Sequence, residues 1–328
     1  MIKLILIIIY LLLSNCSFTK TGFWTEDKKI EELRENSSKI FEKKVVIIKE
    51  FNSNTLIKLD NTNVSNKKPN YITNNLGIEI INEDLNKSSK FRFSKIDNFG
   101  YFEPELNFDD KTFFFFDNKG NLIKFDENFK ILWKKNYYSK SEKKLKPILS
   151  FANDKNLLVI FDNISKFYAV NINSGDLVWS KQNTHPFNSQ IKIFDNKIYS
   201  VDMNNVLRCF SLKDGSEIWS FKSENTFLKS KKRNSLLIAN NLVYFNNSLG
   251  DITAVDAYNG KLIWQTPTQG GEIYENAFSL ITSDLVIKND EIIFSNNRNE
   301  FFSVDMKSGN FRWKNNINAN VRPIVIDK

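Results

Sequence analysis

The chain has 328 residues, of which 41% are hydrophobic and 26% charged, a balance that supports a packed core and argues against overall disorder. The formal net charge is +8 at pH 7, but the lysines are scattered, and no basic stretch interleaved with aromatic residues occurs. Nucleic-acid binding is therefore disfavoured, and a solvated lysine-rich surface is the simpler interpretation.

The first residues predict a secretory signal. Lys3 precedes an uninterrupted apolar run from Leu4 to Leu13. As a helix this run would rise only about 15 Å, half the thickness of a bilayer core, so it is too short for a stable membrane anchor. Its length fits the apolar region of a signal peptide, which we assign to residues 1–15.

The residues that end this segment, Leu13-Ser14-Asn15-Cys16, resemble a bacterial lipobox. The resemblance implies that the peptide is cut before Cys16 and that the Cys16 thiol is acylated. Asn15 departs from the Gly, Ala or Ser that usually precedes the cysteine, and the alternative is an ordinary secretory signal with an accidental cysteine. Ser17, in place of Asp, implies by the same resemblance sorting to the outer membrane.

Internal repeats are the strongest signal in the rest of the chain. Five of the six tryptophans lie at positions 133, 179, 219, 264 and 313, with spacings of 46, 40, 45 and 49 residues. Aligned on tryptophan, the segments read AVNINSGDLVW (169–179), CFSLKDGSEIW (209–219), AVDAYNGKLIW (254–264), SVDMKSGNFRW (303–313) and the shorter KFDENFKILW (124–133).

Each column of this alignment has a physical reason. A small residue marks close strand packing, and a turn-forming Asn, Ser or Asp follows two positions later. A glycine four residues before the tryptophan supplies the positive φ of a hairpin loop, and the tryptophan covers a large apolar area. The residues that carry this structural repeat are Gly175, Trp179, Gly215, Trp219, Gly260, Trp264, Gly309 and Trp313.

Upstream of each tryptophan segment lies another pair of apolar runs separated by turn residues. Four antiparallel strands in roughly 45 residues predict a propeller blade, so we expect an all-β propeller. The Gly-His and Trp-Asp pairs of WD40 repeats are absent, and the period-two pattern excludes helical repeats. The predicted blades are residues 104–136, 147–181, 187–222, 234–266 and 285–315.

The repeat resembles the PQQ-like repeat of quinoprotein dehydrogenases and of BamB-like lipoproteins, and the lipobox favours the latter family. The resemblance implies an eight-bladed propeller, which we place at residues 45–328 after a linker at residues 16–44. Residues 45–95 would supply one degenerate blade, and residues 322–327 would open another. The sequence then looks C-terminally truncated to about six blades, and a smaller complete propeller is the alternative.

We predict no enzyme activity, catalytic residue, metal or cofactor. The family's dehydrogenases use an adjacent cysteine pair with calcium ligands, whereas this domain retains only Cys209, in the small-residue column. With Cys16 acylated, Cys209 also has no intramolecular disulfide partner. His185 is the only histidine, which disfavours a histidine-dependent triad or zinc site. A PQQ-dependent periplasmic dehydrogenase, or a propeller for another protein or glycan, remains the alternative.

In BamB-like proteins, loops on one face bind a POTRA domain of the barrel subunit BamA. The resemblance implies two such loops here, with solvated inter-blade loops as the alternative. The first, residues 226–233, carries Phe227, Leu228, Lys229 and Arg233, and the second, residues 273–284, carries Glu275 and Asp284. The implied function is a lipid-anchored scaffold at the outer membrane, facing the periplasm. Its implied partners are the BamA-like subunit, other members of the assembly complex and unfolded outer-membrane protein clients.

Overall fold

The computed structural model describes residues 107–109, 111–224, 232–268 and 281–323, and every structural statement below concerns these residues. Several predictions lie outside them: the signal at residues 1–15 with the lipidated Cys16, the linker at residues 16–44 and the first part of the predicted propeller. The candidate contact residues Phe227, Leu228, Lys229 and Glu275 also lie outside the described residues.

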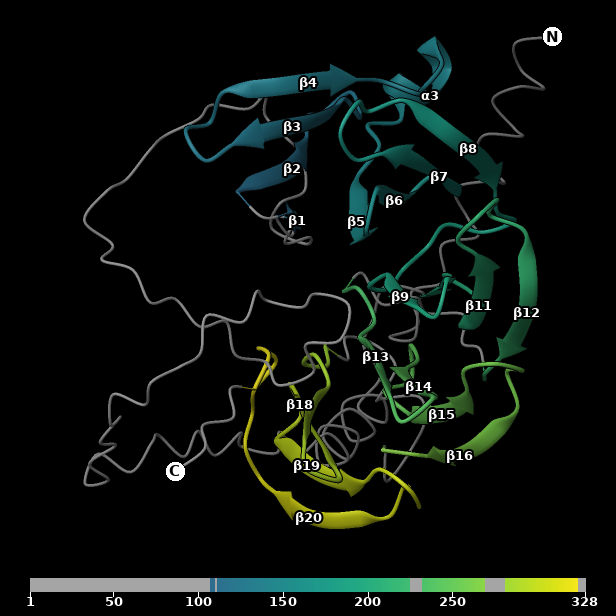
Figure 1. The fold of residues 1–328 in the computed structure, drawn as a ribbon. Coiled ribbons are helices and arrows are strands. Elements are labelled where there is room, and N and C mark those ends of the chain that lie inside the picture. The colour runs from purple at the N-terminus through teal and green to yellow at the C-terminus, as the bar shows by residue number, and fades with distance from the viewer. Residues whose placement is uncertain (1–106, 110, 225–231, 269–280, 324–328) are drawn as a thin grey trace, which may run out of the picture. The chain divides into compact units, whose positions relative to one another are not determined.

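The described chain forms five four-stranded antiparallel sheets, each a meander whose strands pair in chain order (Figure 1). The first two are β1 (Asn107–Asp109), β2 (Thr112–Phe116), β3 (Leu122–Asp126) and β4 (Ile131–Lys135), then β5 (Leu149–Asp154), β6 (Leu157–Asp162), β7 (Lys166–Asn171) and β8 (Leu177–Gln182). The third is β9 (Lys192–Phe194), β10 (Lys197–Val201), β11 (Val206–Ser211) and β12 (Glu217–Lys222). The last two are β13 (Leu236–Ala239), β14 (Leu242–Asn246), β15 (Ile252–Asp256) and β16 (Leu262–Thr266), then β17 (Val286–Lys288), β18 (Glu291–Asn296), β19 (Glu300–Asp305) and β20 (Phe311–Asn315). The predicted all-β blades are confirmed, each within a few residues of its expected bounds.

The hydrophobic core lies between consecutive sheets. Four clusters of buried side chains each combine residues of two neighbouring sheets. Along β10, for example, Ile198 packs toward the second sheet and Tyr199 toward the fourth. A strand buried on both faces needs apolar residues at successive positions, which explains runs such as Leu157-Leu158-Val159-Ile160-Phe161. The blades therefore stabilise one another and do not have separate cores.

The repeat tryptophans lie on the outermost strands, and those of the first four sheets dock onto the next sheet. Trp179 on β8 lies across from the small residue Ala169 on β7, and its Nε1 donates a 3.1 Å hydrogen bond to the Leu212 carbonyl of the third sheet. Trp264 repeats the arrangement, donating to Met306 at 3.0 Å. The small residue across from each tryptophan thus makes room for the indole, and the indole connects two blades.

The repeat glycine has a second role beyond its turn. Gly215 has φ +70°, and a Cβ built there would lie 2.7 Å from the ring of Trp179. Both the backbone conformation and the close approach of the preceding blade therefore require glycine. In the first sheet the turn is shorter, and Phe129 takes the left-handed conformation at φ 60°.

A β-bulge interrupts every outermost strand just before its tryptophan. In the second sheet Trp179 lies across from Ala169, but Leu177 lies across from Val170, so Val178 has no partner position. The same shift occurs in the other four sheets. Leu177 and Val178 are consequently both about half exposed, at 47% and 50%, an arrangement that strict strand alternation does not predict.

Candidate partner-binding face

The meander places two sets of loops on one face of the blades. Three features of each sheet lie on the same side: the start of the first strand, the turn between the second and third strands, and the end of the fourth strand. The glycine turns between the third and fourth strands lie on the opposite side. We call the first side the connection face. It carries the turns at residues 117–121, 162–166, 202–206, 247–251 and 296–300 and the inter-blade connections around residues 136–148 and 183–191. The described ends of the two later connections, at residues 223–224, 232–235, 267–268 and 281–285, lie on the same face. The described ends of both candidate loops, Arg233 and Asp284, lie on it.

The short turns on this face are built on an acidic or amide side chain. Asp162 Oδ1 accepts backbone N–H bonds from Ile164 at 2.9 Å and Lys166 at 2.8 Å. The same cap recurs at the matching position of the other sheets, in Asp117, Asp202, Asn247 and Asn296. These side chains hold the turn, as expected for Asx motifs, so their acidic groups already have a structural task.

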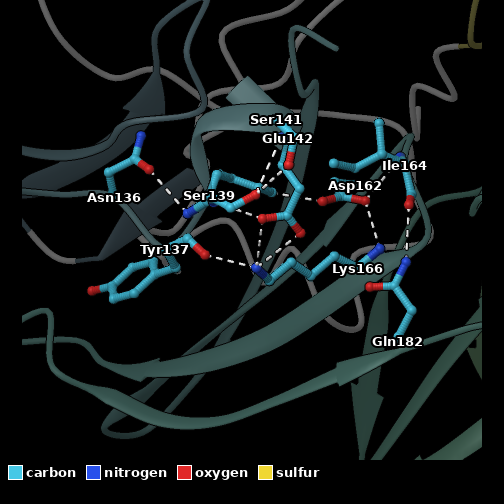
Figure 2. A network of polar contacts seen from close by, with 10 residues as sticks. Asn136, Tyr137, Ser139, Ser141, Glu142, Asp162, Ile164, Lys166 and Gln182 are labelled. Atoms are coloured by element: carbon cyan, nitrogen blue, oxygen red, sulfur yellow. Dashed lines mark hydrogen bonds and ion pairs between the residues drawn. The ribbon is translucent and has the colours of Figure 1, made fainter. Parts of the chain in front are cut away.

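The first connection is clamped by the polar network in Figure 2. It contains the helix α3 (Lys140–Lys144), whose capping box pairs Ser139 with Glu142. Lys166 on β7 reaches across to the same helix, with its Nζ 3.2 Å from Glu142 Oε1, and donates to the Tyr137 carbonyl at 2.7 Å. The network fixes the connection against the second sheet.

Asp162 links this clamp to the turn. Its Oδ2 accepts a 2.7 Å hydrogen bond from the buried Tyr138 hydroxyl. Burial raises the pKa of Asp162 to about 6, although the bonds from Tyr138 and from the Lys166 and Ile164 amides act in the opposite direction. Asp162 therefore keeps its proton to a higher pH than an ordinary aspartic acid does.

Replacing Asp162 with Asn should remove a pH dependence of stability. A carboxyl whose pKa rises on folding binds its proton more tightly in the folded state, so stability falls as pH rises from about 4 to 6. The size is on the order of 2 kcal/mol. Asn occupies the matching position in the fourth and fifth sheets as Asn247 and Asn296. Urea unfolding of parent and Asp162→Asn between pH 4 and 6.5 measures the difference, and parallel pH profiles would contradict it.

The two described candidate contact residues have partners inside the propeller. Arg233 is half-buried, and its Nη1 donates to Ser150 Oγ of β5 at 3.2 Å. Asp284, also half-buried, accepts a 3.3 Å bond from Gln190 Nε2. The structure therefore brings both to one face, with their side chains bonded to residues of other blades. Neither Gln190 nor Lys166 was predicted from the sequence. A usable signal for the segment around Gln190 was the recurring pair before the first strands, Asn188-Ser189, Asn234-Ser235 and Thr282-Ser283.

The other residues weighed as reactive groups occupy structural positions. Cys209 is buried between the third and fourth sheets, and burial raises the pKa of its thiol to about 12. His185 is half-buried, with its Nδ1 3.1 Å from Thr184 Oγ1. Within the described ranges, no three His, Cys, Asp or Glu side chains gather as a metal site would require, and no helix there has the length and apolarity to cross a bilayer.

Four-stranded blades whose tryptophan docks on the turn glycine of the next blade define a β-propeller of PQQ-like repeats. The family model described as outer membrane protein assembly factor BamB matches residues 118–328. The chain belongs to the BamB family. No curated protein sequence matches it.

Solved structures show the same fold at low sequence identity. BamB from Moraxella catarrhalis aligns with a TM-score of 0.54 at 12% identity, over 66% of this chain and 65% of the Moraxella chain. The computationally designed Ika8 protein aligns with a TM-score of 0.51 at 10% identity, over 66% of this chain and 63% of its own. The quinohemoprotein alcohol dehydrogenase from Comamonas testosteroni gives 0.50 at 14% identity, over 65% and 42%. These likenesses concern the fold alone.

Proposed function

We propose that this protein is a non-catalytic scaffold of the outer-membrane β-barrel assembly complex, which binds the POTRA region of a BamA-like subunit and assists barrel folding and insertion. The observation that carries the proposal is its membership of the BamB family. The position of both candidate loop ends on one face supports it. Acylation of Cys16 would hold the chain at the periplasmic side of the outer membrane.

A scaffold role fits how the structure uses its polar groups. Asp162, Asp202 and Asp117 cap turns, and the raised pKa of the buried Cys209 keeps its thiol protonated near neutral pH. A reactive or metal-binding cysteine needs the opposite shift, because the thiolate is the nucleophile and the ligand. These groups support the blades and through them the loops that carry function.

The proposed contacts divide into two kinds. Phe227 and Leu228 would supply the apolar anchors in which binding energy usually concentrates. Lys229 and Glu275 would form a charged rim that orients the partner. Arg233 and Asp284, which bond to Ser150 and Gln190, would hold the bases of the two loops.

Co-purification from outer membranes tests the proposal. The tagged full-length chain should retain the BamA-like subunit, and Phe227→Ala/Leu228→Ala/Lys229→Glu should reduce recovery at least about tenfold. Leu262→Ala/Ile263→Ala is the matched control, because these exposed apolar residues lie on the outermost strand β16. Cys16→Ala should lose fatty-acid labelling and release the protein to the periplasmic fraction. Failure of the parent chain to co-purify, or equal recovery of the loop variant, would contradict the proposal.

A further inference from the structure

The first inter-blade connection concentrates positive charge, although lysines are scattered over most of the sequence. Within residues 140–146 lie four lysines and a single acid, Glu142. The lysines are Lys140, Lys143, Lys144 and Lys146. A stretch of this length around a short helix spans about 10 Å, close to the Debye length in dilute salt. The four ammonium groups therefore repel one another unless a counter-charge is present. We call residues 140–146 the basic segment.

The fold does not require these lysines. The second connection, residues 183–191, also joins a fourth strand to the next first strand, and it contains no lysine and no helix. The helix α3 buries none of its five residues. Lys143 and Lys144 lie in its last turn, where positive charge suits the helix dipole, but Lys140 begins the helix, where the dipole disfavours it. The basic segment therefore has no evident structural reason for its charge.

The one acid of the basic segment is already engaged. The Glu142 carboxylate accepts from the Ser139 amide at 2.6 Å and forms an ion pair with Lys166 of β7 at 3.2 Å (Figure 2). The ion pairs within the described residues include none with Lys140, Lys143 or Lys144. Glu142 thus fixes the helix to the second blade and leaves the positive charge of the segment without a carboxylate partner from this helix.

Leu145 adds an apolar group among the lysines. It caps the C-terminus of α3 and is 62% exposed, whereas the apolar side chains of the outermost strands are at most 50% exposed. Lys144 and Lys146, on either side of it, are exposed. The preceding tyrosines do not share this surface, because Tyr138 is only 5% exposed and Tyr137 is half-buried. The surface therefore offers a leucine flanked by ammonium groups.

These properties favour an anionic lipid surface over other acidic partners. Lysine is a compact point charge without the planar fork with which arginine recognises a single carboxylate or phosphate, and it is depleted in protein–protein interfaces. Single-stranded nucleic acids are bound largely by stacking on aromatic rings, and the basic segment itself contains no aromatic residue. A membrane presents a layer of phosphates above an apolar region, which matches several lysines beside one leucine.

We propose that the basic segment is a contact site for anionic phospholipids at a membrane surface, with Leu145 entering the boundary between headgroups and acyl chains. The site follows the first blade, whereas the two candidate partner loops follow the third and fourth blades. Because Glu142 and Lys166 already hold α3 in place, little ordering is needed on binding. The attraction requires neither the BamA-like subunit nor an acyl group, so it is independent of the proposed function.

Flotation with lipid vesicles tests the site. The full chain carrying Cys16→Ala, which lacks the proposed acyl anchor, is mixed with vesicles of phosphatidylcholine alone or of equal parts phosphatidylcholine and phosphatidylglycerol. The anionic preference is the bound-to-free ratio on the mixed vesicles divided by that on the neutral vesicles. Replacing all four lysines of the basic segment with glutamine should lower this preference at least about tenfold, because each lysine near an anionic surface adds to the attraction. Leu145→Ser should weaken binding to the mixed vesicles about fivefold.

The matched control removes the same charge from four exposed lysines in turns on the opposite face. It is Lys155→Gln/Lys213→Gln/Lys261→Gln/Lys307→Gln. This control should keep the anionic preference within about twofold of the parent, because its lysines lie far apart in the sequence and outside the basic segment. None of the substituted side chains is buried, so melting temperatures should stay within a few degrees of the parent.

Equal losses in the two glutamine variants would mean that net charge alone attracts the vesicles, and would overturn the site. The same conclusion would follow if the four lysines were needed to bind polyglutamate or single-stranded DNA but not to bind vesicles. The vesicles contain no BamA-like subunit. Failure of the chain to co-purify with that subunit would therefore contradict the proposed function and leave the lipid site standing, and loss of the anionic preference would do the reverse.

Discussion

Replacing Trp264 with alanine should lower the free energy of unfolding by about 3–5 kcal/mol, the range for a buried aromatic side chain. Trp264 is only 9% exposed, belongs to the cluster between the fourth and fifth blades and donates to the Met306 carbonyl. Alanine would leave a cavity against Tyr244 and Gly309. Urea unfolding of the full chain measures the change, and a loss below about 1 kcal/mol would mean that this docking contributes little.

Trp219 provides an internal comparison for the hydrogen-bond part of this effect. Its Nε1 is buried without a hydrogen-bond partner among the described residues, and the Tyr199 hydroxyl instead donates to the Ala257 carbonyl at 2.9 Å. Trp219→Phe therefore removes an unsatisfied donor, whereas Trp264→Phe removes a bond. We expect Trp264→Phe to be more destabilising by about 1 kcal/mol, and the reverse order would contradict this account.

Replacing Gly215 with alanine should lower the free energy of unfolding by about 2–5 kcal/mol. A left-handed alanine contributes about 1–2 kcal/mol of this loss, and the crowding of its Cβ against Trp179, 2.7 Å away, contributes about 1–3 kcal/mol more. Lys213→Ala is the matched control, because this exposed residue lies in the same turn and should change stability by no more than about 0.5 kcal/mol. Equal unfolding midpoints for the two variants would contradict this prediction, because they would mean that Trp179 moves away from the added Cβ at little cost.

The blades were predictable because their determinants are local. Gly260 and Trp264 stand at fixed offsets within one hairpin, and strand alternation with turn residues locates the strands around them. The glycine onto which Trp219 docks was not predictable, because Gly260 lies in the next blade and no periodicity within one blade identifies it. The bulge residue Ile263 was missed for a related reason: it breaks the alternation on which strand prediction relies.

On the connection face, too, local features were predictable from the sequence and contacts between blades were not. Family resemblance placed Arg233 and Asp284 in inter-blade connections, and the topology puts both on the connection face. Their partners, Ser150 and Gln190, lie 83 and 94 residues away in the chain. Such pairings depend on how blades stack, so the sequence alone could not supply these hydrogen bonds, and the role of the two residues in partner binding stays a prediction.

The bulges of the outermost strands bear on how the exposed edges of the blades can meet other polypeptide chains. An ordinary exposed edge strand offers unpaired amides and carbonyls on which another chain can form an added strand. Here one bulge residue interrupts the regular pairing of each outermost strand with its neighbour. The five bulge residues are Leu132, Val178, Ile218, Ile263 and Arg312. In the fifth sheet Arg312 is also paired with Asp305 and Glu291. A propeller with such edges exposes leucine, valine and isoleucine side chains without offering another chain an uninterrupted template for an added strand.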